Sequence, residues 1–159
     1  MKKVILLGGL FVLALVACSK KEDEPPYDWK AQYSIDSTKI VNYIAANNIQ
    51  NVKHDSLGIF YQIVNRGQTT DTANAAAYVK VAYIGTFLDK KVFDSSYNAS
   101  FGLNQVITGW TVGIPKIGRG GEINLFLPSI YAYGPGGRSS IPGNTVLIFN
   151  VKLKDFQNK

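Results

Sequence analysis

From residue 57 onward, apolar and polar side chains alternate with the two-residue period of β-strands. Side chains of a strand point alternately to its two sides, so this alternation predicts a sheet with one buried face. In the last run of this kind, Leu147, Phe149, Val151 and Leu153 share one strongly apolar side. Such runs predict strands at residues 58–64, 77–85, 90–94, 121–127 and 145–153.

The connections between these runs favour antiparallel pairing. The corner Leu88-Asp89-Lys90 predicts a hairpin between the run 77–85 and the run 90–94. The polar stretch between Asp94 and Phe101 is interpreted as a loop. We therefore expect five or six antiparallel strands in one sheet.

A segment near the N-terminus has helical spacing instead, and predicts one amphipathic helix at about residues 36–47. Its apolar positions are Ile40, Val41, Ile44 and Ala45. Ser34 or Asp36 is expected to cap its start, and Asn47-Asn48 to end it. We expect this helix to pack against the domain or to brace the segment before it, and a dimer contact is the less favoured alternative.

A second helix is predicted at residues 107–114. It is short because Gly109, Gly113 and Pro115 interrupt it. Antiparallel strands around one short helix make an α+β domain with a half-wrapped sheet, to which the N-terminal helix is added.

The first residues have the pattern of an export signal. Lys2 and Lys3 precede an apolar run of 13 residues, 4–16, whereas a membrane-spanning helix needs about 20. The triplet Leu-Val-Ala before Cys18 resembles the lipobox of bacterial lipoproteins, in which the cysteine is lipidated. We expect residues 1–17 to be a signal peptide and Cys18 to carry a lipid anchor; an ordinary thiol is the alternative.

The remaining chain divides by composition. After Cys18 it is charged and then rich in proline, which predicts a flexible tether over residues 18–33. Residues 34–56 hold the helix and a connector, and residues 57–159 the folded domain. The anchor would place the protein on a bacterial membrane, by our interpretation the outer membrane, facing the periplasm or the cell surface.

Composition also excludes several function classes. The formal charge is +6, but the basic residues occur singly or in pairs, without the dense stripe typical of nucleic-acid binding. With one cysteine, an intramolecular disulfide is impossible, and the one histidine, His54, stands in a polar loop. We therefore predict no metal site, no cofactor and no nucleic-acid partner.

Three motifs carry the candidate chemistry, in a fixed order and at fixed separations. They are Val92-Phe-Asp-Ser-Ser96, Phe101-Gly-Leu-Asn-Gln-Val-Ile-Thr-Gly-Trp110 and Pro128-Ser-Ile-Tyr-Ala-Tyr-Gly134. The second and third motifs place aromatic and branched apolar side chains beside glycine and uncharged polar groups, which is typical of a small apolar pocket. Together they resemble the FKBP family of peptidyl-prolyl cis-trans isomerases over about residues 57–156, and the resemblance implies an FKBP-like fold.

The resemblance also implies roles for individual residues. Trp110 would be the floor of a proline-binding pocket, the hydroxyl of Tyr133 and the backbone N–H of Ile107 would be donors to substrate carbonyls, and Asp94 would be the pocket carboxylate. We expect Tyr83 to be the hydrogen-bond partner of Asp94. The catalytic set is then Tyr83, Phe93, Asp94, Ile107, Trp110 and Tyr133, and the substrate-binding set is Phe101, Val106, Ile141 and Phe149.

The predicted function is therefore peptidyl-prolyl cis-trans isomerisation of X-Pro bonds in exported proteins, without a nucleophile or metal. Proline-containing polypeptides would be its partners, and the resemblance implies macrolide inhibitors as ligands. The alternative from another class is a non-catalytic chaperone or binding lipoprotein with the same fold, which holds proline-containing segments. A chaperone with an inserted substrate-binding domain is disfavoured, because the loop 131–141 has no room for one.

Overall fold

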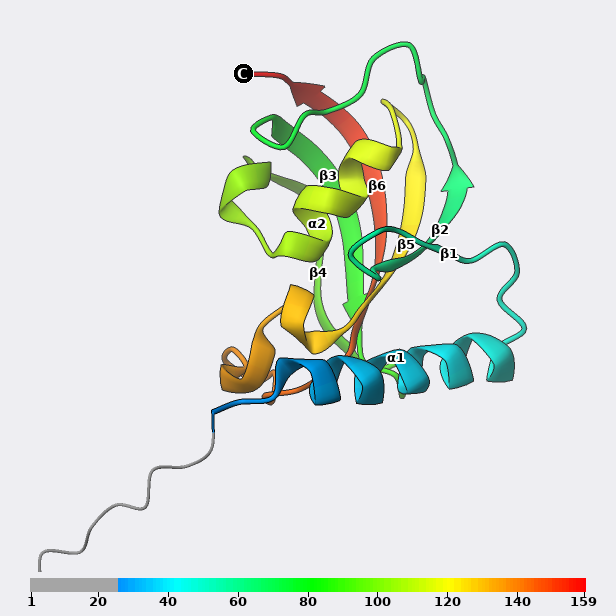
Figure 1. Ribbon diagram of the computed structural model, residues 1–159. Coiled ribbons are helices and arrows are strands. Elements are labelled where there is room, and N and C mark those ends of the chain that lie inside the picture. The colour runs from blue at the N-terminus through cyan, green and yellow to red at the C-terminus, as the bar shows by residue number, and fades with distance from the viewer. Residues whose placement is uncertain (1–25) are drawn as a thin grey trace, which may run out of the picture.

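The computed structural model describes residues 26–159. Six strands form one antiparallel sheet in the order β1-β2-β5-β6-β3-β4, which confirms the predicted α+β class. The sheet curves around the short helix α2, and the long helix α1 crosses its lower end (Figure 1). The helices and strands are α1 (Trp29–Ala46), β1 (Lys53–His54), β2 (Phe60–Asn65), β3 (Tyr78–Thr86), β4 (Val92–Gly102), α2 (Thr108–Gly113), β5 (Glu122–Leu127) and β6 (Leu147–Gln157).

The main core lies between α2 and the inner face of the sheet. The predicted apolar side of β6 forms part of it, with Leu147, Val151 and Leu153 fully buried. Gly109 allows α2 to approach the sheet closely, because a Cβ at this position would stand 2.4 Å from the side chain of Leu127. The close approach seats Trp110, the next residue of the helix, on this core.

Helix α1 begins earlier than predicted. Asp28 caps it by accepting hydrogen bonds from the backbone N–H groups of Lys30 and Ala31, both at 3.0 Å. The proposed caps Ser34 and Asp36 are therefore wrong, and residues 29–33 belong to the helix rather than to the tether. The charged and proline-rich composition directly before them concealed this start. The predicted end is confirmed, with Asn47 as the C-cap.

Helix α1 packs on the outer face of the sheet, as the first alternative predicted. Ile40 is fully buried there with Phe126, Val146 and Ile148, which form a second hydrophobic cluster. Of the other predicted apolar positions, Ile44 is half-buried and packs on this cluster, whereas Val41 is 52% exposed and Ala45 is also exposed. The apolar stripe is thus narrower than the sequence indicated.

Strand β4 is longer than predicted. The hairpin with β3 is confirmed, but pairing continues from Val92 to Gly102 with two irregularities in register. The interpretation of the stretch between Asp94 and Phe101 as a loop is therefore wrong. Ser and Asn favour turns over strands, but β4 pairs with β3 along its length and lies at the edge of the sheet, where polar residues are tolerated.

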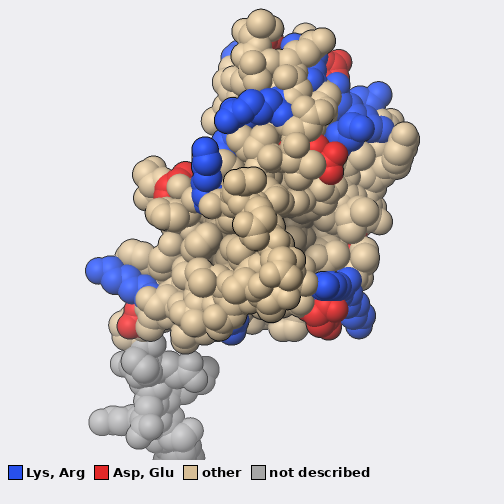
Figure 2. Space-filling model, turned by 90° about the vertical axis from the view of Figure 1, so that its right-hand side faces the viewer, with Lys and Arg blue, Asp and Glu red and all other residues tan. Residues whose placement is uncertain are grey.

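The charged side chains of the surface do not form one continuous patch of a single sign in the face that Figure 2 shows. Figure 2 shows basic side chains as separate groups on one face, with acidic side chains beside several of them. No helix within residues 26–159 is long and apolar enough to cross a membrane. The predicted signal peptide, Cys18 and the start of the tether lie outside the described residues.

Candidate active site

A pocket of about 670 Å³ opens on the inner side of the sheet, between α2, β3, β4 and the loop that follows β5. Eight of the ten residues predicted for the site line it. They are Tyr83, Asp94, Phe101, Val106, Ile107, Trp110, Tyr133 and Phe149. These residues are separated by up to 66 positions in the chain and meet because β3, β4 and β6 are neighbours in the sheet.

Aromatic rings form the floor of the pocket around Trp110, which is only 5% exposed. Its ring centroid lies 5.0 Å from that of Tyr83, 5.2 Å from that of Phe101 and 5.2 Å from that of Phe149. The contacts with Tyr83 and Phe149 are edge-to-face, an arrangement that aromatic pairs favour. The floor is therefore rigid and apolar.

The indole N–H of Trp110 is buried, and within residues 26–159 it has no hydrogen-bond partner. Buried donors are normally paired, because leaving one unpaired costs free energy. Trp110 thus meets the pocket with its ring, and the free energy cost of its unpaired N–H is borne by the protein.

The carboxylate of Asp94 is held by Tyr83, as predicted. The Tyr83 hydroxyl donates to Oδ2 of Asp94 at 2.7 Å, across the β3–β4 pair. Burial raises the pKa of Tyr83 to about 12, with smaller contributions from this hydrogen bond and from the charges of Asp94 and Tyr133. Tyr83 therefore remains a neutral donor throughout the physiological pH range.

Two further donors of the pocket have no protein acceptor among the described residues. The hydroxyl of Tyr133 is one, and the backbone N–H of Ile107, at the N-terminal end of α2, is the other. Neutral donors beside an apolar floor are suited to binding the carbonyl oxygens of an extended peptide.

Two predicted residues lie outside the pocket lining. Phe93 packs behind Phe149, with ring centroids 5.5 Å apart, and also contacts Phe87 at 5.0 Å. Ile141 stands on the loop after β5, where its backbone N–H and C=O pair with those of Arg138 at 2.8 and 2.9 Å. Phe93 thus supports the floor, and Ile141 supports the residue that lines the pocket opening.

The structure adds four lining residues that sequence reasoning missed: Gln105, Thr108, Ala132 and Arg138. Gln105 and Thr108 lie within the second motif and Ala132 within the third, so their position next to predicted site residues was the available signal. The guanidinium of Arg138 lies 5.6 Å from the ring centroid of Tyr133, and it brings a positive charge to the opening. No group of three or more His, Cys, Asp or Glu side chains in the described part of the chain is placed to hold a metal ion.

Comparison with known proteins identifies the family. Residues 69–154, which contain all ten predicted site residues, match the family model described as FKBP-type peptidyl-prolyl cis-trans isomerase. The chain belongs to the FKBP family. An FKBP-like fold, expected from the three motifs, is thereby confirmed.

The chain is similar to FKBP-type isomerases named FkpA. It is 45% identical to the protein of Aeromonas hydrophila over 116 residues, which are 70% of this chain and 43% of that relative. It is 43% identical to the protein of Escherichia coli K12 over 108 residues, 65% of this chain and 40% of the relative. The chain therefore spans less than half the length of these FKBP relatives.

Two solved structures have the same FKBP fold. The crystal structure of FkpA from Escherichia coli has a TM-score of 0.69 at 34% identity, and covers 80% of this chain and 64% of that one. A peptidyl-prolyl cis-trans isomerase from Pseudomonas syringae has a TM-score of 0.70 at 28% identity, and covers 84% of this chain and 98% of that one.

Proposed function

We propose that this FKBP-family protein is a peptidyl-prolyl cis-trans isomerase that acts in the pocket floored by Trp110. One observation carries this proposal: a rigid aromatic floor lies beside two hydrogen-bond donors, the Tyr133 hydroxyl and the Ile107 N–H, that have no acceptor within residues 26–159. Membership in a family described by this activity supports it further.

The reaction explains why an apolar pocket is useful. Rotation about a peptide bond has a barrier of about 18–20 kcal/mol, because the planar amide is stabilised by resonance. As the bond twists, its charge separation decreases, so an apolar site disfavours the planar amide relative to the twisted one. Burying an uncompensated amide costs roughly 2–7 kcal/mol, and each ~1.4 kcal/mol removed from a barrier is a tenfold gain in rate.

The pocket residues have complementary tasks in this proposal. The proline ring rests on Trp110, and Phe101 and Phe149 exclude water beside it. Tyr133 and the Ile107 N–H bind substrate carbonyls and keep the peptide fixed while one amide turns. Asp94, held by Tyr83, orients polar neighbours of the twisted bond rather than acting as a base. No covalent step is needed.

The setting of the reaction is also part of the proposal. We infer that residues 1–17 direct export and that Cys18 carries a lipid, so that the protein acts from a bacterial membrane, by preference the outer membrane. Its substrates would then be X-Pro bonds of exported polypeptides in the periplasm or at the cell surface. Macrolide inhibitors would occupy the same aromatic pocket.

The test is the rate of cis-to-trans conversion of short X-Pro peptides by the purified protein, beside Trp110→Leu and Tyr133→Phe variants. We expect acceleration by the parent and a loss in both variants, with folding checked by circular dichroism. A well-folded parent that accelerates no peptide, whichever residue precedes proline, would overturn the enzyme proposal. Binding without acceleration would instead establish the non-catalytic binding module.

A further inference from the structure

A buried carboxylate joins the N-terminal helix to the loop that carries Tyr133. Asp36, in the middle of α1, is 0% exposed. Its Oδ2 accepts hydrogen bonds from the backbone N–H and the hydroxyl of Ser129, at 2.8 and 2.5 Å, across 93 positions of sequence. Ser129 is itself 1% exposed and begins the short 3₁₀ helix η3 (Ser129–Tyr131), four positions before Tyr133.

The carboxylate of Asp36 is held on its other side as well. Its Oδ1 accepts from Nε2 of Gln32 at 2.8 Å, and Nζ of Lys39 lies 3.8 Å away. A buried charge is costly unless it is paired and hydrogen-bonded, so these partners make the position of the carboxylate well defined. Ser129 therefore docks on a preformed site of α1.

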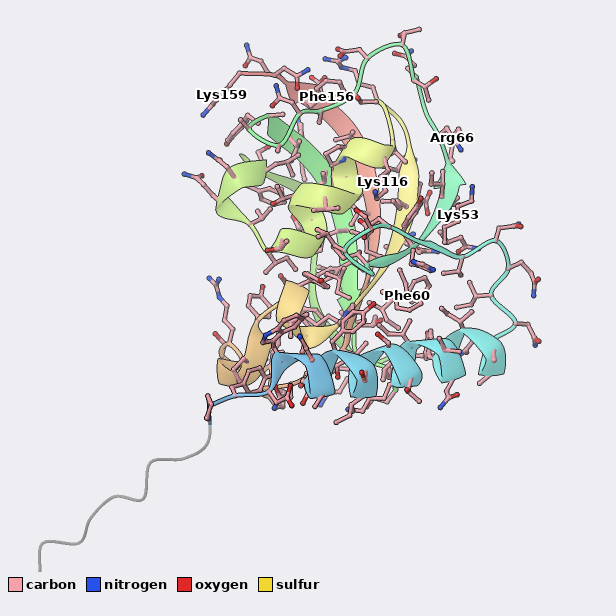
Figure 3. All side chains as sticks on the ribbon, viewed as in Figure 1. Lys53, Phe60, Arg66, Lys116, Phe156 and Lys159 are labelled. Carbon is pink, nitrogen blue, oxygen red and sulfur yellow. The ribbon has the colours of Figure 1, made fainter. Side chains whose placement is uncertain are left out.

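Two more contacts hold the same loop on α1. The rings of Tyr33, on α1, and Tyr131, in η3, meet edge-to-face with centroids 6.4 Å apart. At the far end of the loop, the hydroxyl of Tyr27, just before α1, donates to Oδ1 of Asn144 at 2.6 Å. Figure 1 shows the loop as the orange segment that rests on the N-terminal half of α1, and the side chains between them fill this space in Figure 3.

The loop has little regular structure of its own to fix Tyr133. Residues 128–144 contain two 3₁₀ turns and one isolated β-bridge but no strand. Gly134, directly after Tyr133, has a φ of 58°, and Gly137, three positions further on, has a φ of 63°; both glycines lower the stiffness of the segment. The loop is therefore held by its contacts with the rest of the protein: Tyr133 packs on the main core, and the buried hydrogen bonds of the loop are those of Ser129 with α1.

We infer that α1 positions the catalytic loop, and that Asp36 is a positioning residue for Tyr133. The inference rests on the proposed isomerase function and assigns a task to a helix that lies outside the matched family region, residues 69–154. Asp36 does not touch the pocket; it acts through Ser129 on the placement of a donor. Misplacement of a catalytic group by about 1 Å can cost on the order of 100-fold in rate, so the effect is measurable.

The experiment compares Asp36→Ala with Ile40→Ala in the full chain. Ile40 is the matched control, because it is also 0% exposed on α1 but packs on Phe126, Val146 and Ile148 of the sheet. At equal folded fraction, we expect Asp36→Ala to lower kcat/KM about tenfold and Ile40→Ala to change it less than twofold. Asp36→Asn, which retains an acceptor for Ser129, should recover most of the activity. Equal effects of the two alanine variants would overturn the inference.

A double-mutant cycle separates positioning from general loosening. In a Tyr133→Phe background the hydroxyl is absent, so Asp36→Ala should cost at most about twofold more. Fully multiplicative losses would contradict the inference. If Asp36→Ala fails to fold, Ser129→Ala replaces it in the same cycle, because it removes only the hydroxyl bond and should cause a smaller loss in the same direction.

A readout independent of catalysis distinguishes this inference from the proposed function. In protein with ¹³C-labelled tyrosine, the ring signals of Tyr133 should shift or broaden in Asp36→Ala and stay in place in Ile40→Ala. With that result and an inactive parent, the isomerase proposal fails and the positioning of Tyr133 by α1 stands. Unchanged Tyr133 signals in Asp36→Ala would overturn the inference even in an active protein.

Discussion

The pocket has two walls that are held in different ways. The wall of β3, β4, β6 and α2 consists of aromatic rings packed on the main core, with Trp110 in contact with three of them. The wall opposite is the loop 128–144, which packs on the core through Tyr133 but is also held by hydrogen bonds to Asp36 of α1 and to Tyr27, just before α1. The apolar environment thus comes from the core itself, while the loop that carries the donor Tyr133 has a further support from the N-terminal segment.

This difference predicts how the two walls respond to mutation. Changes in the core wall should lower both stability and activity, since the same rings do both tasks. Removal of the Tyr133 hydroxyl from the loop wall should lower activity with little loss of stability, because this hydroxyl has no partner among the described residues and contributes no protein hydrogen bond.

The largest effect is expected for Trp110→Leu. It removes the pocket floor, and we expect activity to fall at least about 30-fold and the free energy of unfolding to fall by about 2–4 kcal/mol. Urea denaturation and the isomerisation assay measure the two changes.

Phe126→Leu is the control, because Phe126 is 2% exposed in the outer cluster. It should destabilise the protein by about 1–3 kcal/mol and leave kcat/KM of the folded protein unchanged. Equal loss of activity in both variants would show that Trp110 acts only through stability.

Tyr133→Phe comes next. It removes one hydroxyl from the loop wall, and the loss of one hydrogen bond to the substrate, about 1–1.5 kcal/mol, corresponds to a roughly tenfold lower rate. The unfolding midpoint should not change. Tyr97→Phe, at a position 84% exposed on edge strand β4, is the matched control and should be silent in both measurements. If Tyr133→Phe loses stability but not activity, the Tyr133 hydroxyl serves the fold and does not bind the substrate.

Tyr83→Phe should reduce activity several-fold, because Asp94 then loses the hydrogen-bond donor 2.7 Å away that holds it.

The same variant should also change how the stability of the protein depends on pH. The pKa of Tyr83 is raised from 10.0 to about 12, mainly by burial, so the unfolded chain releases this proton at lower pH than the folded protein. The contribution of Tyr83 to stability is therefore complete below pH 10 and is lost as pH rises toward 12.

Thermal unfolding of the parent and of Tyr83→Phe between pH 8 and pH 12 checks this sign. The parent should lose more stability than the variant above pH 10. Parallel pH profiles would show that the environment of Tyr83 is not the one described.

The smallest effect on activity is expected on the outer face of the sheet. There Asn124 accepts from Nδ2 of Asn150 and donates to Oε1 of Gln62, both at 2.8 Å. Asn124→Ala should lower the free energy of unfolding by about 1 kcal/mol and leave kcat/KM within twofold of the parent. A substantial loss of activity would mean that the outer face takes part in the function.

Sequence reasoning succeeded on the core wall for a physical reason. Strand β6 alternates regularly, so the shared face of Leu147, Val151 and Leu153 could be assigned before their partners were known. Of the eight predicted residues that line the pocket, six lie in the three motifs, and Tyr83 and Phe149 were implied by the family resemblance. The proposed bond between Tyr83 and Asp94 followed from the need of a carboxylate for a donor, and the structure contains it.

The hydrogen bonds by which α1 holds the loop wall could not be predicted from the sequence. Asp36 stood where a helix cap was expected, and nothing local indicated that its partner is Ser129, 93 positions away. The length of β4 was missed because its polar residues favour turns, and only the pairing with β3 keeps them in a strand. Both errors concern interactions whose second partner lies elsewhere in the chain.

Exchange spectroscopy on an X-Pro peptide at equilibrium, with the indole N–H signal of Trp110 followed in the same sample, tests the proposed activity and its site together. We predict that a small amount of protein brings cis and trans signals into exchange, and that the indole signal shifts along the same peptide titration. A Trp110 shift without exchange would establish binding alone and contradict catalysis. Exchange without any Trp110 shift would place the active site elsewhere.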